Sequence, residues 1–228
     1  MGLSVERLGW REFRERLLNF AALDVQTRQA IVFRGQGSSD WPLTASLDRW
    51  RRFSSDRERD QANLELLQSF RRELILADLR GDLQDARLLE LLARHHGLPS
   101  PLLDWTSSPY MAAFFAFEAL KVGKATHVSV WVLDRGRLRE ASQAFDFIDE
   151  PELLRFNPRA LRQHGVFVRV NTIAQALEGL LEPGLSRYDI DAGDGPLALA
   201  DLDAMRINAS NLYGDLDGVC RTVISRMQ

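Results

Sequence analysis

The sequence has almost no cysteine and no long apolar run, and each shortage excludes a class of protein. Cys220 is the single cysteine among 228 residues, so an internal disulfide is excluded. The sequence is compatible with a protein of a reducing compartment. We expect Cys220 to be buried filler rather than a nucleophile. No apolar run reaches the roughly 18 residues that span a bilayer, and the first residues carry mixed charge without a secretory signal. The sequence therefore predicts a cytoplasmic protein with no membrane partner.

A positive excess is also missing. The formal net charge is −3, so the chain lacks the electropositive field of a dedicated DNA-binding domain, although a local basic patch stays open. The arginine-rich segment 49–60 also contains acids, and we interpret it as a solvated, salt-bridged face. The adjacent pair His95 and His96 cannot easily ligate one ion, and only two further histidines exist. No metal is expected.

What is present is an ordinary globular composition, with 45% hydrophobic and 27% charged residues. No repeat, linker or break in composition divides the chain, and its length suits one domain. We therefore expect a single domain over 1–228, with an N-terminal helix within 1–27 and a motif-bearing core over 28–218.

Hydrophobic periodicity predicts the main helices and strands. Helices are expected at about 4–20, 60–79, 82–95 and 109–121, with a short helical turn at 158–164, and strands at 30–35, 127–133 and 165–170. Gly97 suits the end of the third helix, and Ser107 or Ser108 suits the start of the fourth. Between them, Pro99 and Pro101 keep the chain extended. This irregular alternation favours a mixed α+β domain.

Arg34 is the first candidate for chemistry. The strand expected at 30–35 is apolar on both faces until this arginine. A guanidinium that leaves a buried strand must pair with a carboxylate of the protein or with an anionic ligand. Asp104, inside an apolar segment, is the obvious internal partner. Gly35 allows either a ligand or another backbone to approach closely.

A second group of polar residues surrounds Asp104. His95 and His96 either bond the free carbonyls at a helix end or face a ligand. Asp104 itself is an ion-pair partner, a loop cap or part of a site. Trp105 is either core packing or a stacking wall for a base or a nicotinamide ring. Further along, Arg159 and Gln163 lie four apart on one helical face, a spacing that is common by chance.

These segments resemble the FRG domain family, which is named for the Phe-Arg-Gly found here at 33–35. The first matching block is FRGQ followed by WPLTASLDR. The second is HHGLPSPLLDWTSSPYMAAFFA, and the third is RALRQHGVF together with LYGDLDG. The blocks run from about 31 to 218, so the resemblance implies one FRG domain over 1–228.

The order of these motifs also resembles, more remotely, the NAD-dependent ADP-ribosyltransferase superfamily. In that superfamily an Arg or His closes an early strand, a Ser/Thr segment precedes a buried helix, and a Glu lies near a later strand. Arg34, the segment 106–108 and Gln163 occupy the matching positions here. The resemblance implies a small central split sheet flanked by helices, in an ADP-ribosyltransferase-like fold, with NAD as the substrate.

The resemblance also assigns roles to residues. It implies the catalytic set Arg34, Asp104, Thr106 and Gln163, and the NAD-binding set Arg34, Gly35, Gln36, His96, Trp105 and Ser107. Gln163 stands where the transferases usually have Glu, and an amide cannot act as a general base. Asp104 is the alternative carboxylate. If the assignment is right, the four catalytic candidates converge on one cleft.

The function implied is an ADP-ribosyltransferase-like enzyme that cleaves NAD and transfers ADP-ribose to a protein or nucleic acid. Such an enzyme fits a bacterial toxin or antiphage effector, with a neutralising partner as a further expectation. The alternative is a non-catalytic FRG module that binds a nucleotide or a nucleic acid. Metal-dependent nuclease activity is disfavoured, because no paired carboxylates have metal-ligand spacing.

Overall fold

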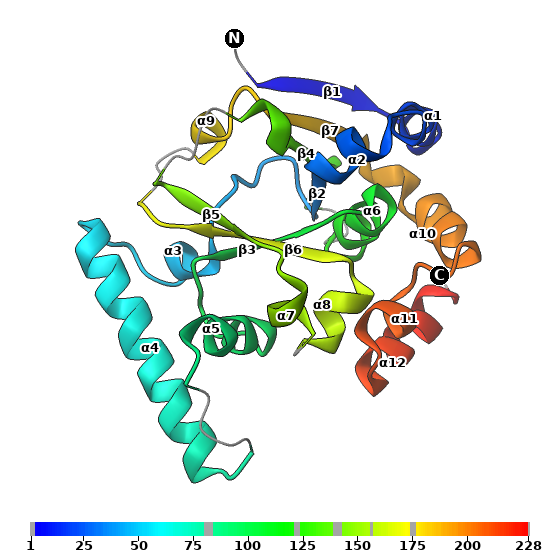
Figure 1. Cartoon of the computed structure of the whole chain (residues 1–228). Coiled ribbons are helices and arrows are strands. Elements are labelled where there is room, and N and C mark those ends of the chain that lie inside the picture. Colours follow the sequence, from blue (N-terminus) through cyan, green and yellow to red (C-terminus); the bar gives the residue numbers. More distant parts are fainter. Residues whose placement is uncertain are drawn as a thin grey trace.

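A single mixed sheet of seven strands lies at the centre of the molecule and is flanked by helices (Figure 1). The computed structural model describes residues 3–79, 84–120, 124–138, 143–155, 157–173 and 177–227. In spatial order the strands are β1 (Ser4–Leu8), β7 (Leu185–Asp191), β4 (His127–Asp134), β2 (Ile31–Gln36), β3 (Leu102–Thr106), β6 (Gly165–Val170) and β5 (Phe145–Ile148). Only β1 and β7 run parallel among these pairs.

The sheet is narrowest between β2 and β3. The two strands share one registered pair, Phe33 with Thr106, whereas β2 pairs with β4 from Ile31 to Gln36. Beyond that pair the two halves of the sheet separate. The expected mixed α+β fold is therefore confirmed, with its weakest sheet connection next to Arg34.

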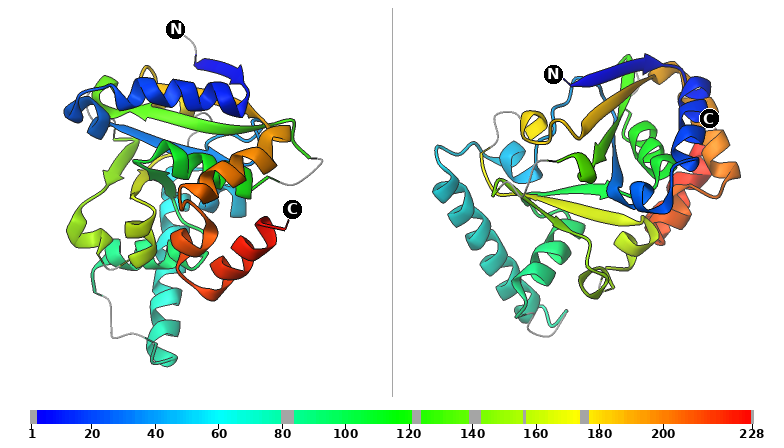
Figure 2. Two further views of the ribbon diagram at one scale, coloured as in Figure 1. Left: turned by 90° about the vertical axis from the view of Figure 1, so that its right-hand side faces the viewer. Right: turned by 45° about the horizontal axis from the view of Figure 1, so that its top comes forward.

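Some helices pack against this sheet and others extend away from it. They are α1 (Trp10–Ala21), α2 (Val25–Ala30), α3 (Ser46–Trp50), α4 (Asp56–Leu76), α5 (Ala86–His95), α6 (Pro109–Glu118), α7 (Pro151–Leu154), α8 (Pro158–Arg162), α9 (Leu177–Leu180), α10 (Gly195–Ala204), α11 (Ala209–Tyr213) and α12 (Leu216–Ser225), with single 3-10 turns at Arg135–Arg137 and Ala192–Asp194. Both views of Figure 2 show α4 extending away from the sheet beside α5. The pair α11 and α12 lies at the opposite side of the molecule (Figure 1).

Most expected elements are confirmed. The helix expected at 60–79 is shifted to Asp56–Leu76, and the other four expected helical segments are shorter than the periodicity suggested. The strands β2, β4 and β6 lie within one residue of their expected bounds. Residues 82, 83 and 121, at the expected ends of two helices, lie outside the described residues. The helix expected at 4–20 is wrong over its first turns, because Ser4–Leu8 forms β1 and the helix starts at Trp10. The backbone of β7 supplies the hydrogen bonds that make this segment a strand.

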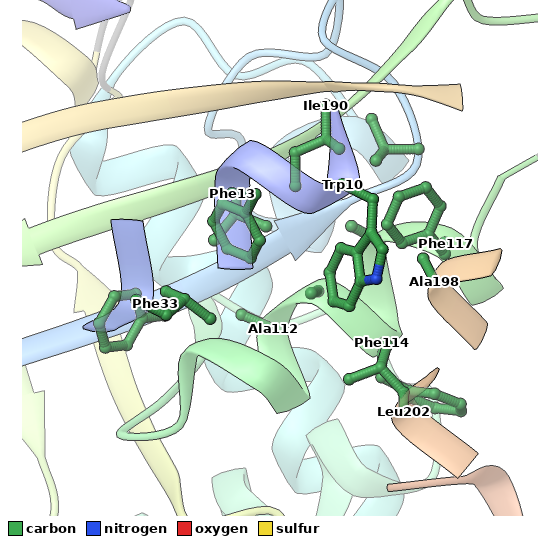
Figure 3. Close-up of a cluster of buried hydrophobic side chains, with 14 of the residues drawn as sticks. Trp10, Phe13, Phe33, Ala112, Phe114, Phe117, Ile190, Ala198 and Leu202 are labelled. Carbon is green, nitrogen blue, oxygen red and sulfur yellow. The ribbon is translucent and has the colours of Figure 1, made fainter. Parts of the chain in front are cut away.

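Helix α6 is central and buried, as its apolar composition predicts. Ala112, Ala113 and Ala116 are fully buried in the cluster that also holds Trp10. Figure 3 shows side chains of α1, α6, α10 and β7 gathered in this cluster. A Cβ on Gly35 would lie 1.9 Å from the carbonyl oxygen of Ala112. The glycine therefore lets the backbone of α6 rest directly on β2.

Cys220 is exposed on α12, so the expectation of a buried cysteine is wrong. The buried residues of α12 are Gly218 and Thr222. A Cβ on Gly218 would lie 2.6 Å from the carbonyl oxygen of Ala209, which shows that the small residues face α11. Cys220 lies on the other side of the helix and points to solvent.

Candidate functional site

Arg34 lies where β2 and β3 separate, next to the single pair that joins them. Its Nη1 donates a hydrogen bond of 2.6 Å to the main-chain oxygen of Asp104. Its Nε is buried and has no hydrogen-bond partner. Burial lowers the pKa of Arg34 to about 10, with Asp104 opposing that shift and Arg94 and Arg49 adding to it. The side chain is therefore cationic at neutral pH, with one buried donor unused.

The carboxylate of Asp104 pairs with Arg94 of α5 instead of Arg34. Nε of Arg94 lies 3.2 Å from Oδ1, and Nη2 donates to Oδ2. The expected contact between Arg34 and Asp104 thus exists, but it uses the main-chain carbonyl. Burial raises the pKa of Asp104. The charge and hydrogen bonds of Arg94, and then the charge of Arg34, have the opposite effect and are stronger together, so the pKa of Asp104 is lowered overall. Asp104 is ionised at neutral pH, and its side chain is 48% exposed.

Arg49 of α3 is the third guanidinium at this place. It donates from Nη1 to the main-chain oxygen of Thr44. Burial lowers its pKa, and the charge of Arg94 lowers it further. The neighbouring Asp48 cannot fully neutralise it, because Arg59 holds both oxygens of Asp48 at 2.7 and 2.9 Å. We call Arg34, Arg49 and Arg94, with Asp104 between them, the arginine cluster.

Helix α3 is fixed against the start of β3 by Ser46. Its Oγ accepts from the backbone N–H of Ser100 at 3.0 Å and also accepts from Nη1 of Arg94 at 3.2 Å. The N–H of Leu47 donates to the Ser100 carbonyl. The arginine cluster is therefore assembled from three elements, β2, α3 and α5, around one residue of β3.

Thr106 and Gln163 are brought together at the end of β3. Thr106 is 3% exposed, donates from Oγ1 to the main-chain oxygen of Gln163 at 2.7 Å and accepts from the N–H of Ser108. The side-chain amide of Gln163 donates to the carbonyl of Leu212 at 3.2 Å. The hydroxyl and the amide nitrogen therefore join β3, α8 and α11.

Of the residues expected to bind NAD, Gln36 and Trp105 are buried, and Gly35 is half-buried against α6. Gly35 faces the backbone of α6. The amide of Gln36 accepts from the indole of Trp131 at 2.7 Å and donates to the carbonyl of Pro42. Trp105 is 2% exposed in the core, and its indole nitrogen is buried without a partner. Core packing, rather than a stacking wall, describes this tryptophan.

The histidines end α5, and Ser107 lies beyond β3. The backbone N–H of His96 donates to Leu92, and His96 is exposed. Burial lowers the pKa of His95, as do the charges of His96 and Arg159, so this ring is neutral at pH 7. Ser107 is exposed, and its N–H donates to the carbonyl of His164. Ser108, the other expected cap, accepts from Met111 at the start of α6.

Sequence reasoning did not assign Arg49 or Arg94 to the site. The solvated, salt-bridged face expected over 49–60 holds for Arg49, which is exposed, and for the exposed pair of Arg51 and Glu58. It does not hold for Arg59, which is 1% exposed. Arg94 immediately precedes the two histidines. A signal for both was present, because Arg49 ends the block WPLTASLDR and Arg94 adjoins the block that begins HHGLPS.

Comparison with known proteins bears on the first part of the chain. Residues 29–124 match the family model described as FRG domain, a range that contains the whole arginine cluster. No curated protein and no solved structure matches the chain. Within the described ranges, no group of three or more His, Cys, Asp or Glu could hold a metal ion. Of the helices described, none is long and apolar enough to cross a membrane.

Proposed function

We propose that this chain, which carries an FRG domain over residues 29–124, binds a phosphate-bearing nucleotide at the arginine cluster, with NAD as the candidate ligand. The observation that carries the proposal is the buried Nε of Arg34, which has no partner. An unpaired buried donor costs free energy unless an acceptor reaches it. Guanidinium groups recognise phosphate through paired N–H donors and stay charged.

The charges of the arginine cluster support an anionic ligand. Arg94 takes both carboxylate oxygens of Asp104. Arg34 contacts the main-chain oxygen of the same residue, and the charge of Asp104 acts on Arg49. The nearby carboxylate of Asp48 is held by Arg59. The cluster therefore keeps an excess of positive charge, which a phosphate group would offset. Partial burial strengthens such an attraction relative to water.

Isothermal titration with AMP, ADP and NAD tests the binding proposal. We expect Arg34→Met to weaken ADP and NAD by ~10-fold or more, since a hydrogen bond to a charged group contributes about 1.5–3 kcal/mol. Arg87→Met is the matched control, because Arg87 forms an exposed pair with Glu150 outside the cluster. Wild-type protein that binds none of these nucleotides, or an Arg34→Met variant that binds them equally well, would contradict the proposal.

A second candidate function is transfer of ADP-ribose from NAD to a protein or nucleic acid. In this reaction the bond between nicotinamide and ribose C1′ breaks, nicotinamide leaves with the bonding electrons, and the acceptor attacks C1′ and loses a proton. The developing positive charge on the ribose needs an anionic group nearby. Asp104 favours this function, because it is ionised and 48% exposed. Gln163 lacks a charge and its amide nitrogen is engaged by Leu212.

The transfer proposal is tested by incubating the protein with NAD and a cell lysate. We expect free nicotinamide and ADP-ribose attached to a macromolecule, as a toxin or antiphage effector would produce. Asp104→Asn should retain ADP binding, since it removes only negative charge, but should release far less nicotinamide. Nicotinamide release by Asp104→Asn at the wild-type rate would refute this role of Asp104. Binding without any release by the wild-type protein would leave a non-catalytic nucleotide-binding module.

A further inference from the structure

Arg159, in the first turn of α8, has a guanidinium whose donors are unused. Its Cζ lies 3.9 Å from the centre of the Tyr213 ring, and the residue is half-buried. Among the residues that the structure describes, its guanidinium makes no hydrogen bond and no ion pair. Stacking on an aromatic face fixes the plane of a guanidinium and leaves its N–H edge available.

Tyr213 is itself held in place. Its hydroxyl donates to the carboxylate of Glu118 at the end of α6. Glu118 also pairs with Arg221 at 3.2 Å, and Arg221 lies 5.4 Å from the same ring. In the described part of the chain, the ion pair of Glu118 is with Arg221 and not with Arg159. The positive charge of Arg159 therefore remains available to a ligand.

Hydrogen bonds link Arg159 to the strand that holds Asp104. The backbone N–H of Gln163 donates to the carbonyl of Arg159, and Thr106 of β3 donates to the carbonyl of Gln163. Leu91 of α5 and Ala160 of α8 belong to one hydrophobic cluster, and Figure 1 shows α8 between α5 and the α11 and α12 pair. The charge of Arg159 contributes to lowering the pKa of both His95 and Asp104. Arg159 thus lies within electrostatic reach of Asp104, while Arg34 contacts the main chain of the same residue.

We propose that Arg159, stacked on Tyr213, is a second phosphate anchor, so that the site takes a ligand with two linked phosphates rather than one. This inference rests on the proposed nucleotide-binding function and narrows its ligand class. One phosphate would contact Arg34 and Arg49, and the second would reach the free edge of Arg159. The carboxylate between the two anchors is compensated by Arg94.

The test compares AMP and ADP, which differ by one phosphate, in titrations of wild-type protein and Arg159→Met. We expect Arg159→Met to weaken ADP by ~10-fold or more while AMP changes less than ~2-fold. Arg159→Lys keeps the positive charge but lacks the planar pair of N–H donors. Its affinity for ADP should lie between those of wild type and Arg159→Met. The methionine can still cover Tyr213, and a thermal melt of each variant verifies its fold. Arg162→Met, one turn further along α8 and next to Gly214, is the matched control.

The outcomes separate this inference from the function on which it rests. Equal weakening of AMP and ADP by Arg159→Met, or no change in either, overturns the second anchor while nucleotide binding stands. Loss of both nucleotides in Arg34→Met, alongside selective loss of ADP in Arg159→Met, supports two anchors. If wild-type protein binds neither nucleotide, the proposed function and this inference both fail.

Discussion

At the scale of residues, Arg34 owes its environment to its position in β2. Phe33 pairs with Thr106, and no registered pair with β3 follows it. The guanidinium fills the opening, where one nitrogen reaches the Asp104 carbonyl and Nε finds no acceptor. Burying a charged group with an unused donor is unfavourable for folding. A ligand-binding role explains such an arrangement better than a stabilising one.

The pairing of Asp104 with Arg94 predicts a dependence of stability on pH. The pKa of Asp104 is lowered in the folded protein. The pair therefore contributes its full stabilisation above the unfolded pKa of about 3.9, and loses it as pH falls through the lower folded value. Thermal melts should show Asp104→Asn below wild type at pH 7, by at most about 1 kcal/mol because the carboxylate is half-exposed. The gap should narrow as the pH falls below about 3.9, and a gap independent of pH would count against the ion pair.

At the scale of elements, the contact of α6 with β2 depends on Gly35. A Cβ there would lie 1.9 Å from the Ala112 oxygen and 2.6 Å from the Ala116 nitrogen. Both are backbone atoms, so the helix as a whole must move away from the strand. Arg34 precedes Gly35 in the same strand, so this contact also positions the backbone of Arg34.

Gly35→Ala should therefore lower the free energy of unfolding by about 3 kcal/mol or more, as overpacking in a rigid contact does. Urea denaturation measures the change. Gly179→Ala is the matched control, since a Cβ there meets nothing within 4 Å and should leave stability within about 1 kcal/mol of wild type. If Gly35→Ala unfolds like the control, α6 does not rest on β2 as described.

Helix α3 depends on a buried arginine of α4. Arg59 is 1% exposed, holds Asp48 with two hydrogen bonds and donates to the carbonyl of Val170. Removing one partner of such a pair typically costs about 3–5 kcal/mol. We expect Arg59→Met to destabilise the protein by about this much in urea denaturation, and Arg59→Met with Asp48→Leu to recover part of the loss. A double variant less stable than Arg59→Met would contradict this view of the pair.

Strongly periodic or continuously apolar segments could be predicted from sequence, and partner-dependent ones could not. Helix α6 and strands β2, β4 and β6 carry their own apolar signal. Strand β7 does not carry such a signal, because the charged Asp189 interrupts it. Asp189 is buried there only with hydrogen bonds from Ser129 and Arg187, and these depend on the fold. The site divides in the same way. Arg34 and Asp104 stand out against apolar neighbours. Arg49, Arg94 and Arg159 lie on helices with other charged residues, where only their place in or next to the FRG-like blocks marks them in the sequence.

At the scale of the whole molecule, the site lies where the two halves of the sheet meet. Arg34 belongs to the half that contains β4 and β7, while Asp104 belongs to the half that contains β6 and β5. A bound phosphate would therefore connect halves that share only one strand pair. Because the net charge is −3, the attraction to an anion is local to the arginine cluster and does not come from the field of the molecule.

A ligand that joins the two halves should stabilise the folded state by mass action. At an ADP concentration of about 100 times the dissociation constant, the expected gain is about 2.7 kcal/mol. Calorimetric melts should show a higher unfolding temperature with ADP for wild type and for Arg87→Met. Because Arg34→Met should bind ADP ~10-fold more weakly or worse, it should gain at most about 1.4 kcal/mol at the same ADP concentration. An equal rise in Arg34→Met would place the bound nucleotide elsewhere.

The most direct test of the central claim observes the Nε–H group of Arg34 itself. A ¹⁵N–¹H correlation spectrum of the arginine Nε–H groups, assigned with Arg34→Lys, reports whether this donor gains an acceptor. On addition of ADP, we predict that the Arg34 resonance shifts downfield. The Nε–H of Arg59, which already donates to Asp48 at 2.7 Å, should stay in place. An Arg34 resonance that does not move while ADP saturates the protein would contradict the account.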